Sequence, residues 1–232
     1  MPPRPRKGFY IASDQQIREG RTTDVYFQHT MQVLQAKGKA REEALAEFTV
    51  GGLPRSWPWG VLCGVEEVLR LFEGRKVDIR GLPEGTVFKA KSFGGIRVPV
   101  ITIEGPYGEY CIYETPALGF LCHSSGVATM AARARIAAKD KTLLSFGVRR
   151  MHPAISPMLD RSAYIGGCDS VSSLLGAETI GALPSGTMPH ALMVMKHSGD
   201  DRRKARNGPQ NFCADSRVLL NQVEFRVGQR PL

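Results

Sequence analysis

The sequence contains no pair of cysteines in the C-x-x-C spacing that is typical of zinc and redox sites. Its five cysteines are scattered along 232 residues, and their number is odd. This usage is typical of buried free thiols in a reducing compartment rather than of a disulfide framework. We therefore expect neither a structural zinc site nor disulfide bonds. The five are Cys63, Cys111, Cys122, Cys168 and Cys213.

Long apolar runs are also missing. No run reaches the roughly 18 residues that a membrane-spanning helix needs. The basic start, MPPRPRKG, is not followed by the apolar core of a signal peptide. The sequence therefore predicts a cytoplasmic protein with no membrane association. Hydrophobic residues still make up 42% of the chain, which suffices for one large or two small domains.

Acidic residues are too few to balance the basic ones, and the formal net charge is +9. An excess of positive charge favours either nucleic acid or a small polyanionic substrate. The basic residues do not form a helical stripe with interleaved aromatic rings, as a nucleic-acid surface often does. The densest basic stretch, residues 202–206, lies near the C-terminus. We therefore expect a small anionic substrate and no nucleic acid.

Residues 1–115 predict an α+β domain. Thr22, Thr23 and Asp24 have the composition of a helix N-cap, and Gly38 marks the end of the helix that follows. Further along, short β-branched runs separated by glycine and proline indicate strands. The expected elements are a helix end and strand over residues 44–50, a helix over 61–72, and strands at 87–90, 98–103 and 110–113.

Residues 116–195 show a different alternation. Thr115 and Pro116 predict the start of a helix. On this helix Arg133 and Arg135 are expected to form a solvated face, with a phosphate contact by one of them as the alternative. Three short apolar runs then have the length of buried strands, and polar or glycine-rich residues follow each of them. This alternation predicts an α/β fold with a parallel sheet or barrel. The runs are residues 142–146, 168–171 and 178–183.

In such folds the chemistry lies just past the carboxyl ends of the strands. An aromatic ring, two guanidinium groups, a carboxylate and an imidazole are expected at this edge, and together they suit a small planar anion and a phosphorylated partner. No metal site made by protein side chains alone is visible. The side chains concerned belong to Phe146, Arg149, Arg150, Asp169, Thr187 and His190.

Four phrases around these residues resemble the nicotinate phosphoribosyltransferase family. They are Phe146-Gly147-Val148-Arg149-Arg150, His152-Pro153, Gly166-Gly167-Cys168-Asp169 and Gly186-Thr187-Met188-Pro189-His190. Their order and spacing are similar to those of the short, archaeal-type enzymes. The resemblance runs from Gly8 to Leu192 and is specific, because it rests on several phrases in one order.

The resemblance implies both a fold and a reaction. The fold would be a small open-sheet α+β domain followed by a parallel β/α barrel of the type II phosphoribosyltransferase kind. The reaction joins nicotinate to phosphoribosyl pyrophosphate in NAD salvage and gives nicotinate mononucleotide and pyrophosphate. It is often coupled to ATP hydrolysis, with Mg²⁺ bound alongside the phosphate groups. The resemblance further implies a homodimer with shared active sites.

The resemblance also implies how the nicotinate ring is held. Phe146 would cover one face of the ring, and Tyr26 of a neighbouring subunit the other, as part of an element that includes Asp24. Arg149 would pair with the carboxylate, the group that a guanidinium binds best. Arg150 would support this contact or meet phosphate.

The remaining site residues would act on the ribose and the phosphate groups. Asp169 would orient the ring nitrogen or bind ribose hydroxyls, and from its position it would also cap the helix that follows. Thr187 would hold phosphate oxygens. His190 would accept a phosphoryl group, since imidazole is a competent nucleophile near neutral pH.

Two other interpretations stay open. Quinolinate phosphoribosyltransferase shares the superfamily, although a substrate with two carboxylates calls for a more basic pocket. Residues 196–232 form an atypical tail without strand–helix alternation, which indicates a truncated or frameshifted barrel gene. A non-catalytic paralogue with a new C-terminus is the alternative, and we expect the chain alone to be marginally stable and inactive.

Overall fold

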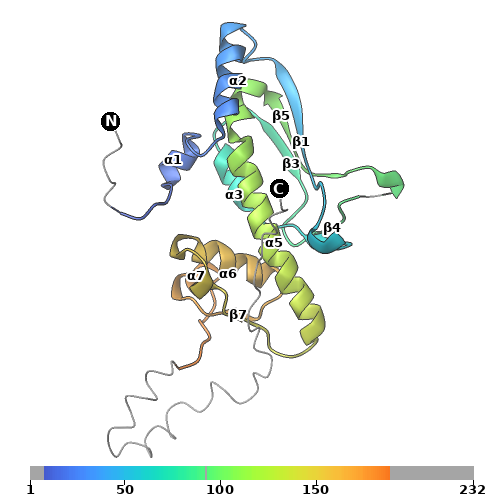
Figure 1. The fold of residues 1–232 in the computed structure, drawn as a ribbon, viewed down its shortest axis with the longest axis vertical. Coiled ribbons are helices and arrows are strands. Elements are labelled where there is room, and N and C mark those ends of the chain that lie inside the picture. Colours follow the sequence, from blue (N-terminus) through green and yellow to red (C-terminus); the bar gives the residue numbers. More distant parts are fainter. Residues whose placement is uncertain (1–7, 92, 189–232) are drawn as a thin grey trace, which may run out of the picture. The chain divides into compact units, whose positions relative to one another are not determined.

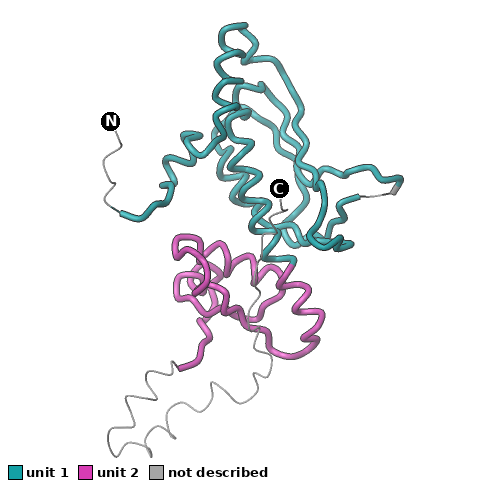
Figure 2. The backbone as a smooth tube through the Cα atoms, viewed as in Figure 1, with its two compact units in different colours: residues 1–129 teal, residues 130–232 magenta. Residues whose placement is uncertain are grey.

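A computed structural model describes residues 8–91 and 93–188, which fall into two compact units (Figures 1 and 2). Unit 1 comprises residues 1–129 and unit 2 residues 130–232, so the division lies inside the helix α5 (Glu114–Ala138). The domain boundary predicted after residue 115 lies at the start of this helix. The predicted tail, residues 196–232, lies outside the described residues.

Unit 1 is built on a three-stranded antiparallel sheet in the order β1–β5–β3, with β5 in the centre. A separate antiparallel pair joins β2 and β4. The strands are β1 (Glu43–Thr49), β2 (Gly60–Val61), β3 (Asp78–Gly81), β4 (Val87–Phe88) and β5 (Pro99–Pro106). The helices are α1 (Asp14–Arg18), α2 (Val25–Ala36), η1 (Pro54–Ser56), α3 (Val65–Phe72), η2 (Phe93–Gly95), α4 (Tyr107–Tyr110) and η3 (Cys111–Tyr113).

The core of unit 1 lies between this sheet and two helices, α3 and the first half of α5 (Figure 1). The central strand places Ile101 and Ile103 in the core, since alternate residues of a strand face the same side. Val68 of α3 and Leu121 of α5 pack against them. Each such side chain contributes about 1.5–3 kcal/mol when it is fully buried. This packing fixes α5, which continues into unit 2.

Unit 2 contains two parallel strands, β6 (Leu144–Ser145) and β7 (Ser170–Val171), with Leu144 paired to Ser170. The chain between them crosses over through η4 (Val148–Arg150), η5 (Pro153–Ile155) and α6 (Ser156–Ile165). A short helix, α7 (Leu174–Thr179), follows β7. Parallel strands joined by a helix are the repeating unit of parallel sheets and barrels. The predicted fold class, α/β with an α+β first domain, is confirmed.

The predicted strand at residues 178–183 is wrong, because α7 occupies the start of this segment. Ser173 caps α7 by accepting a hydrogen bond from the Gly176 N–H, and Ala177 then faces the core. Short apolar runs do not distinguish a strand from a buried helix, and here the serine cap decides between them. The described part of unit 2 therefore contains two of the three expected strands.

Four predictions about unit 1 also need correction. Residues 110–113 form a helical turn and not a strand. Thr115 is therefore not an N-cap, because helical structure already precedes it. The segment at residues 44–50 is a strand from its start, since β1 pairs with β5 along its length. The helix predicted over residues 61–72 begins at Val65, because Gly64 has a φ of 90° and interrupts it.

The bounds predicted for α2 are confirmed. Asp24 stands at the N-cap position, although its side chain makes no capping hydrogen bond, and Gly38 lies just past the end of the helix with a φ of 67°. Three described cysteines, Cys63, Cys111 and Cys168, are buried, but Cys122 is exposed. In the part of the chain that the structure describes, no helix has the length and apolar character needed to cross a membrane.

Candidate functional site

The best-supported site residues follow strand β6. Phe146 comes directly after the strand and is half-buried. The chain then makes one 3-10 turn, in which the Arg150 N–H donates to the Gly147 carbonyl at 3.2 Å. This turn presents Arg149 and Arg150 to solvent. The ring and both guanidinium groups thus lie within five consecutive residues at the carboxyl edge of the sheet, as the sequence predicts.

Neither guanidinium in this turn has a hydrogen bond or an ion pair with another described residue. Two cations without a described partner, in the same five-residue segment as a partly covered aromatic ring, form an arrangement that attracts a planar anion. A ring packs against an aromatic face, and a carboxylate accepts two parallel hydrogen bonds from one guanidinium. The turn Phe146–Arg150 is therefore suited to an aromatic carboxylate.

Asp169 does not lie at the carboxyl edge of the sheet. Strand β7 begins one residue later, so Asp169 lies at the amino edge of the sheet, opposite Phe146. Its carboxylate accepts a hydrogen bond from the Leu143 N–H at 2.7 Å and forms an ion pair with Arg135. Desolvation raises the pKa of Asp169, but these two contacts outweigh it and hold the pKa below its usual range. The predicted grouping of Asp169 with Phe146 is therefore corrected.

Arg135 is not the solvated residue that the sequence predicts. Its guanidinium donates to the carbonyl of Gly167 at 2.7 Å and to that of Lys141 at 2.8 Å, beside its ion pair with Asp169. These contacts join the end of α5 to the segments that enter both strands. Asp169 and Arg135 thus hold β6 and β7 together at their amino ends. Asp169 also does not cap α7, because Ser173 does.

One buried carboxylate escaped the sequence analysis. Asp160 of α6 is fully buried, and the hydroxyls of Ser145 and Ser173 donate to it. Both serines lie at the carboxyl ends of the strands or just beyond them. The available signal was a charged residue within the apolar face of α6, between Leu159 and Ala163.

Tyr26 and Asp24 belong to unit 1, whereas the turn Phe146–Arg150 belongs to unit 2. The Tyr26 side chain is 55% exposed and its ring lies 4.2 Å from that of Phe27. Asp24 accepts a hydrogen bond from the Thr115 hydroxyl at 3.1 Å, which joins the start of α2 to α5. Partial desolvation and the nearby carboxylates of Glu114 and Asp24 raise the pKa of Tyr26, so its phenol is neutral.

The two remaining predicted residues lie near the end of the described chain. Thr187 is exposed and belongs to no helix or strand. His190 lies outside the described residues. Within residues 8–91 and 93–188, no three His, Cys, Asp or Glu side chains gather in a way that could hold a metal ion. The described side chains alone therefore do not form a Mg²⁺ site.

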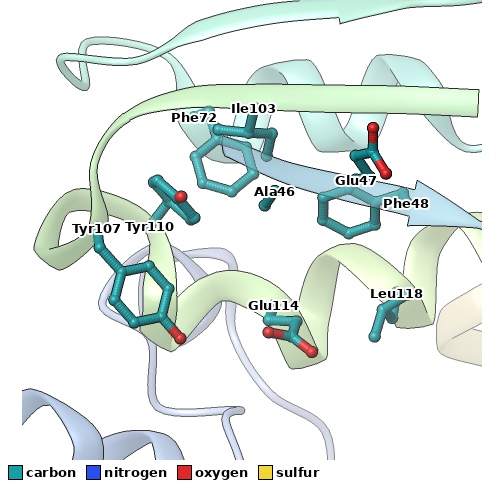
Figure 3. A pocket seen from close by; sticks show the side chains of 9 residues that line it. All are labelled: Ala46, Glu47, Phe48, Phe72, Ile103, Tyr107, Tyr110, Glu114 and Leu118. Carbon is teal, nitrogen blue, oxygen red and sulfur yellow. The ribbon is translucent and has the colours of Figure 1, made fainter. Parts of the chain in front are cut away.

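A pocket of about 140 Å³ lies in unit 1, between β1, β5 and the start of α5 (Figure 3). Its wall is aromatic and aliphatic, with two carboxylates, Glu47 and Glu114. Burial raises the pKa of Glu114. Two carboxylates repel a negatively charged ligand, so this pocket does not suit a carboxylate or phosphate substrate. The other lining residues are Ala46, Phe48, Phe72, Ile103, Tyr107, Tyr110 and Leu118.

The chain is similar to known proteins named after nicotinate and quinolinate, which are aromatic carboxylates of the kind that the turn Phe146–Arg150 suits. Residues 24–125 match the family described as quinolinate phosphoribosyl transferase, N-terminal domain. The human protein named nicotinate phosphoribosyltransferase is 34% identical over 172 residues, which are 70% of this chain and 31% of the human one. Nicotinate phosphoribosyltransferase 1 of Arabidopsis thaliana is 35% identical over 175 residues, 72% of this chain and 30% of its own length.

Solved structures agree with these matches. A structure titled nicotinate-nucleotide pyrophosphorylase from Pyrococcus furiosus superposes with a TM-score of 0.77 at 51% identity, covering 82% of this chain and 47% of that one. Human nicotinic acid phosphoribosyltransferase superposes with a TM-score of 0.68 at 25% identity, covering 78% and 42%. The chain therefore spans about a third of its curated relatives and less than half of these solved chains.

The matches cover both units: the family match lies in unit 1, and the relatives extend it across the βαβ segment of unit 2. All of them carry names from pyridine nucleotide metabolism. The predicted resemblance is thereby confirmed: the chain is similar to nicotinate phosphoribosyltransferases, and its matches fit a member of the type II phosphoribosyltransferase superfamily.

Proposed function

We propose that the protein acts as a nicotinate phosphoribosyltransferase, which joins nicotinate to phosphoribosyl pyrophosphate and releases pyrophosphate. The observation that carries this proposal is the turn Phe146–Arg150 at the carboxyl edge of the sheet, whose five residues include a half-buried ring and two guanidinium groups with no partner among the described residues. The names of the human and Arabidopsis relatives support it.

In this proposal Arg149 pairs with the nicotinate carboxylate through two hydrogen bonds, and Phe146 packs against the pyridine ring. Both contacts direct the ring nitrogen toward C1 of the ribose, where pyrophosphate leaves. Holding two reactants in such an orientation contributes up to about 7–11 kcal/mol to catalysis. Arg150 supports the carboxylate or contacts a phosphate group. Asp169 acts on this edge only indirectly, by fixing the strand that carries Phe146.

Coupling to ATP also stays a proposal. Thr187 would contact phosphate oxygens, and His190 would accept a phosphoryl group from ATP. When bound, Mg²⁺ would offset the negative charge of the phosphate groups, which usually supply several of its ligands in such sites.

Quinolinate phosphoribosyltransferase is the second candidate. The matched family description and the exposure of two neighbouring guanidinium groups favour it, since quinolinate carries two carboxylates. A nicotinate enzyme needs one guanidinium group for the single carboxylate of its ligand, whereas a quinolinate enzyme needs both. Ligand binding to the purified chain therefore distinguishes them.

We expect the chain to bind nicotinate about 10- to 150-fold more tightly than nicotinamide, because only nicotinate is charged at neutral pH. Arg149→Ala should remove this preference. Isothermal titration calorimetry with nicotinate, nicotinamide and quinolinate measures it. Arg97→Ala, an exposed arginine of unit 1, is the matched control and should keep it. Equal affinities for nicotinate and nicotinamide contradict the proposal, and a strong preference for quinolinate supports the second candidate.

We further propose a homodimer in which Tyr26 covers the nicotinate ring of the partner subunit. The exposure of Tyr26 supports this, because its ring is free to contact another molecule. Tyr26→Ala should weaken nicotinate binding about 2- to 12-fold, the value of one aromatic contact, and Tyr26→Phe should restore it. Tyr10→Ala is the exposed control. Analytical ultracentrifugation that finds a monomer with full affinity for nicotinate would overturn the shared site.

A further inference from the structure

Asp160 is the only Asp, Glu, Lys, Arg or His side chain that is buried in the described part of the chain. No cation pairs with it there, and burial raises its pKa, which the bonds from Ser173 and Ser145 lower only in part. A buried carboxylate without a cation is costly, and an amide or apolar side chain of similar size would fit at lower cost. Its presence therefore needs an explanation other than stability.

The contacts of Asp160 supply that explanation. One oxygen, Oδ1, accepts a hydrogen bond from the Ser145 hydroxyl at 3.4 Å. The other, Oδ2, accepts from the Ser173 hydroxyl, which in turn accepts from the Gly176 N–H at 3.0 Å. A single carboxylate on α6 thus joins the last residue of β6 to the cap of α7.

Gly176 shows how closely these elements meet. A Cβ atom at this position would lie 2.2 Å from Oδ2 of Asp160, so α7 rests directly on the carboxylate. Only a residue without a side chain allows this approach. The carboxylate is therefore held from two sides, and its position fixes Ser145 in turn.

Ser145 is the residue immediately before Phe146. We propose that Asp160 is a positioning residue, which orients the turn Phe146–Arg150 through its hydrogen bond with Ser145 and so sets the affinity for the aromatic carboxylate. This inference rests on the proposed function for its ligand, but the geometry of the turn can be measured without one.

The ligand-independent test is hydrogen–deuterium exchange of the full chain, read by mass spectrometry over residues 146–151. Two amides there close the turn, from Arg150 to Gly147 and from Met151 to Val148. Asp160→Asn and Ser145→Ala should each speed their exchange about tenfold, the consequence of one lost hydrogen bond. Unchanged exchange in both variants would overturn the inference, whether or not the wild-type chain binds nicotinate.

The ligand-dependent test is a double-mutant cycle on the nicotinate dissociation constant. Asp160→Asn and Ser145→Ala should each raise it about tenfold, and the double variant should raise it no further, because both remove one linkage. Fully additive effects would show that Asp160 does not act through Ser145, and would overturn the proposal. If Asp160→Asn fails to fold, Ser145→Ala still decides through the exchange rate, since it removes only a half-buried hydroxyl.

Ser162→Ala separates positioning from stability. Ser162 is also buried on α6, and its hydroxyl donates to the Met158 carbonyl at 2.7 Å. This variant should lower the unfolding temperature but leave the nicotinate dissociation constant within about twofold. If Ser162→Ala weakens nicotinate binding as much as Asp160→Asn does, any destabilisation of α6 lowers the affinity. That result would contradict a specific positioning role for Asp160. A wild-type chain that does not bind nicotinate, but shows the exchange effect, would contradict only the proposed function.

Discussion

Replacing Gly64 with alanine should destabilise unit 1 by about 2–6 kcal/mol, the sum of backbone strain and overpacking. Gly64 has a φ of 90°, which side-chain-bearing residues rarely adopt. A Cβ atom there would lie 2.4 Å from the Phe120 carbonyl oxygen of α5. That carbonyl cannot retreat easily, because the neighbouring Leu121 is packed in the core.

Tryptophan fluorescence during urea unfolding measures this effect, because both tryptophans of the chain, Trp57 and Trp59, lie in unit 1, shortly before Gly64 in the sequence. Gly74→Ala is the matched control. Gly74 has a similar φ of 78°, but a Cβ atom there would meet nothing within 4 Å. Gly74→Ala should lower the free energy of unfolding only by the cost of backbone strain, about 1–3 kcal/mol. Equal losses in the two variants would mean that the approach of α5 to Gly64 is not a tight contact.

The elements that the sequence predicted well carry their signals locally. Gly38 ends α2 within the segment itself, and Asp24 stands at the N-cap position, although its carboxylate bonds to Thr115 and not to the first turn. The phrase from Phe146 to Arg150 follows a strand, and the structure places it at the carboxyl edge for that reason. The roles assigned to these side chains stay predictions, but their place in the fold follows from the spacing of neighbouring residues.

The errors about the site concern residues whose partners are distant in the sequence. Asp169 was assigned to the wrong edge because the apolar run at residues 168–171 does not show where pairing begins, and its partner Arg135 lies 34 residues earlier. Arg135 has the sequence signature of any solvated helix residue, and only the fold brings carbonyl groups around it. Asp160 likewise depends on Ser145 and Ser173, at separations of 15 and 13 residues. Charge can be read from a sequence, but burial and pairing require the tertiary structure.

A buried leucine gives the second large effect. Leu143 is fully buried just before β6, and its N–H and carbonyl both bond to Asp169, at 2.7 and 2.8 Å. Leu143→Ala would leave these backbone bonds possible but remove most of the side chain from the core of unit 2. Truncation of a buried leucine costs about 2–5 kcal/mol, because transfer free energy is lost and a cavity is left.

Native-state hydrogen exchange over residues 159–163 of α6 measures this loss, since buried amides report the free energy of opening of their unit. Leu183→Ala removes the same atoms from a side chain that is 87% exposed, and should change stability by no more than about 0.5 kcal/mol. The difference between the two leucines therefore isolates burial. If Leu143→Ala changes the exchange of α6 as little as Leu183→Ala does, the strand β6 is not packed against a cooperative core in unit 2, and the turn Phe146–Arg150 lacks the rigid support that the proposed site requires.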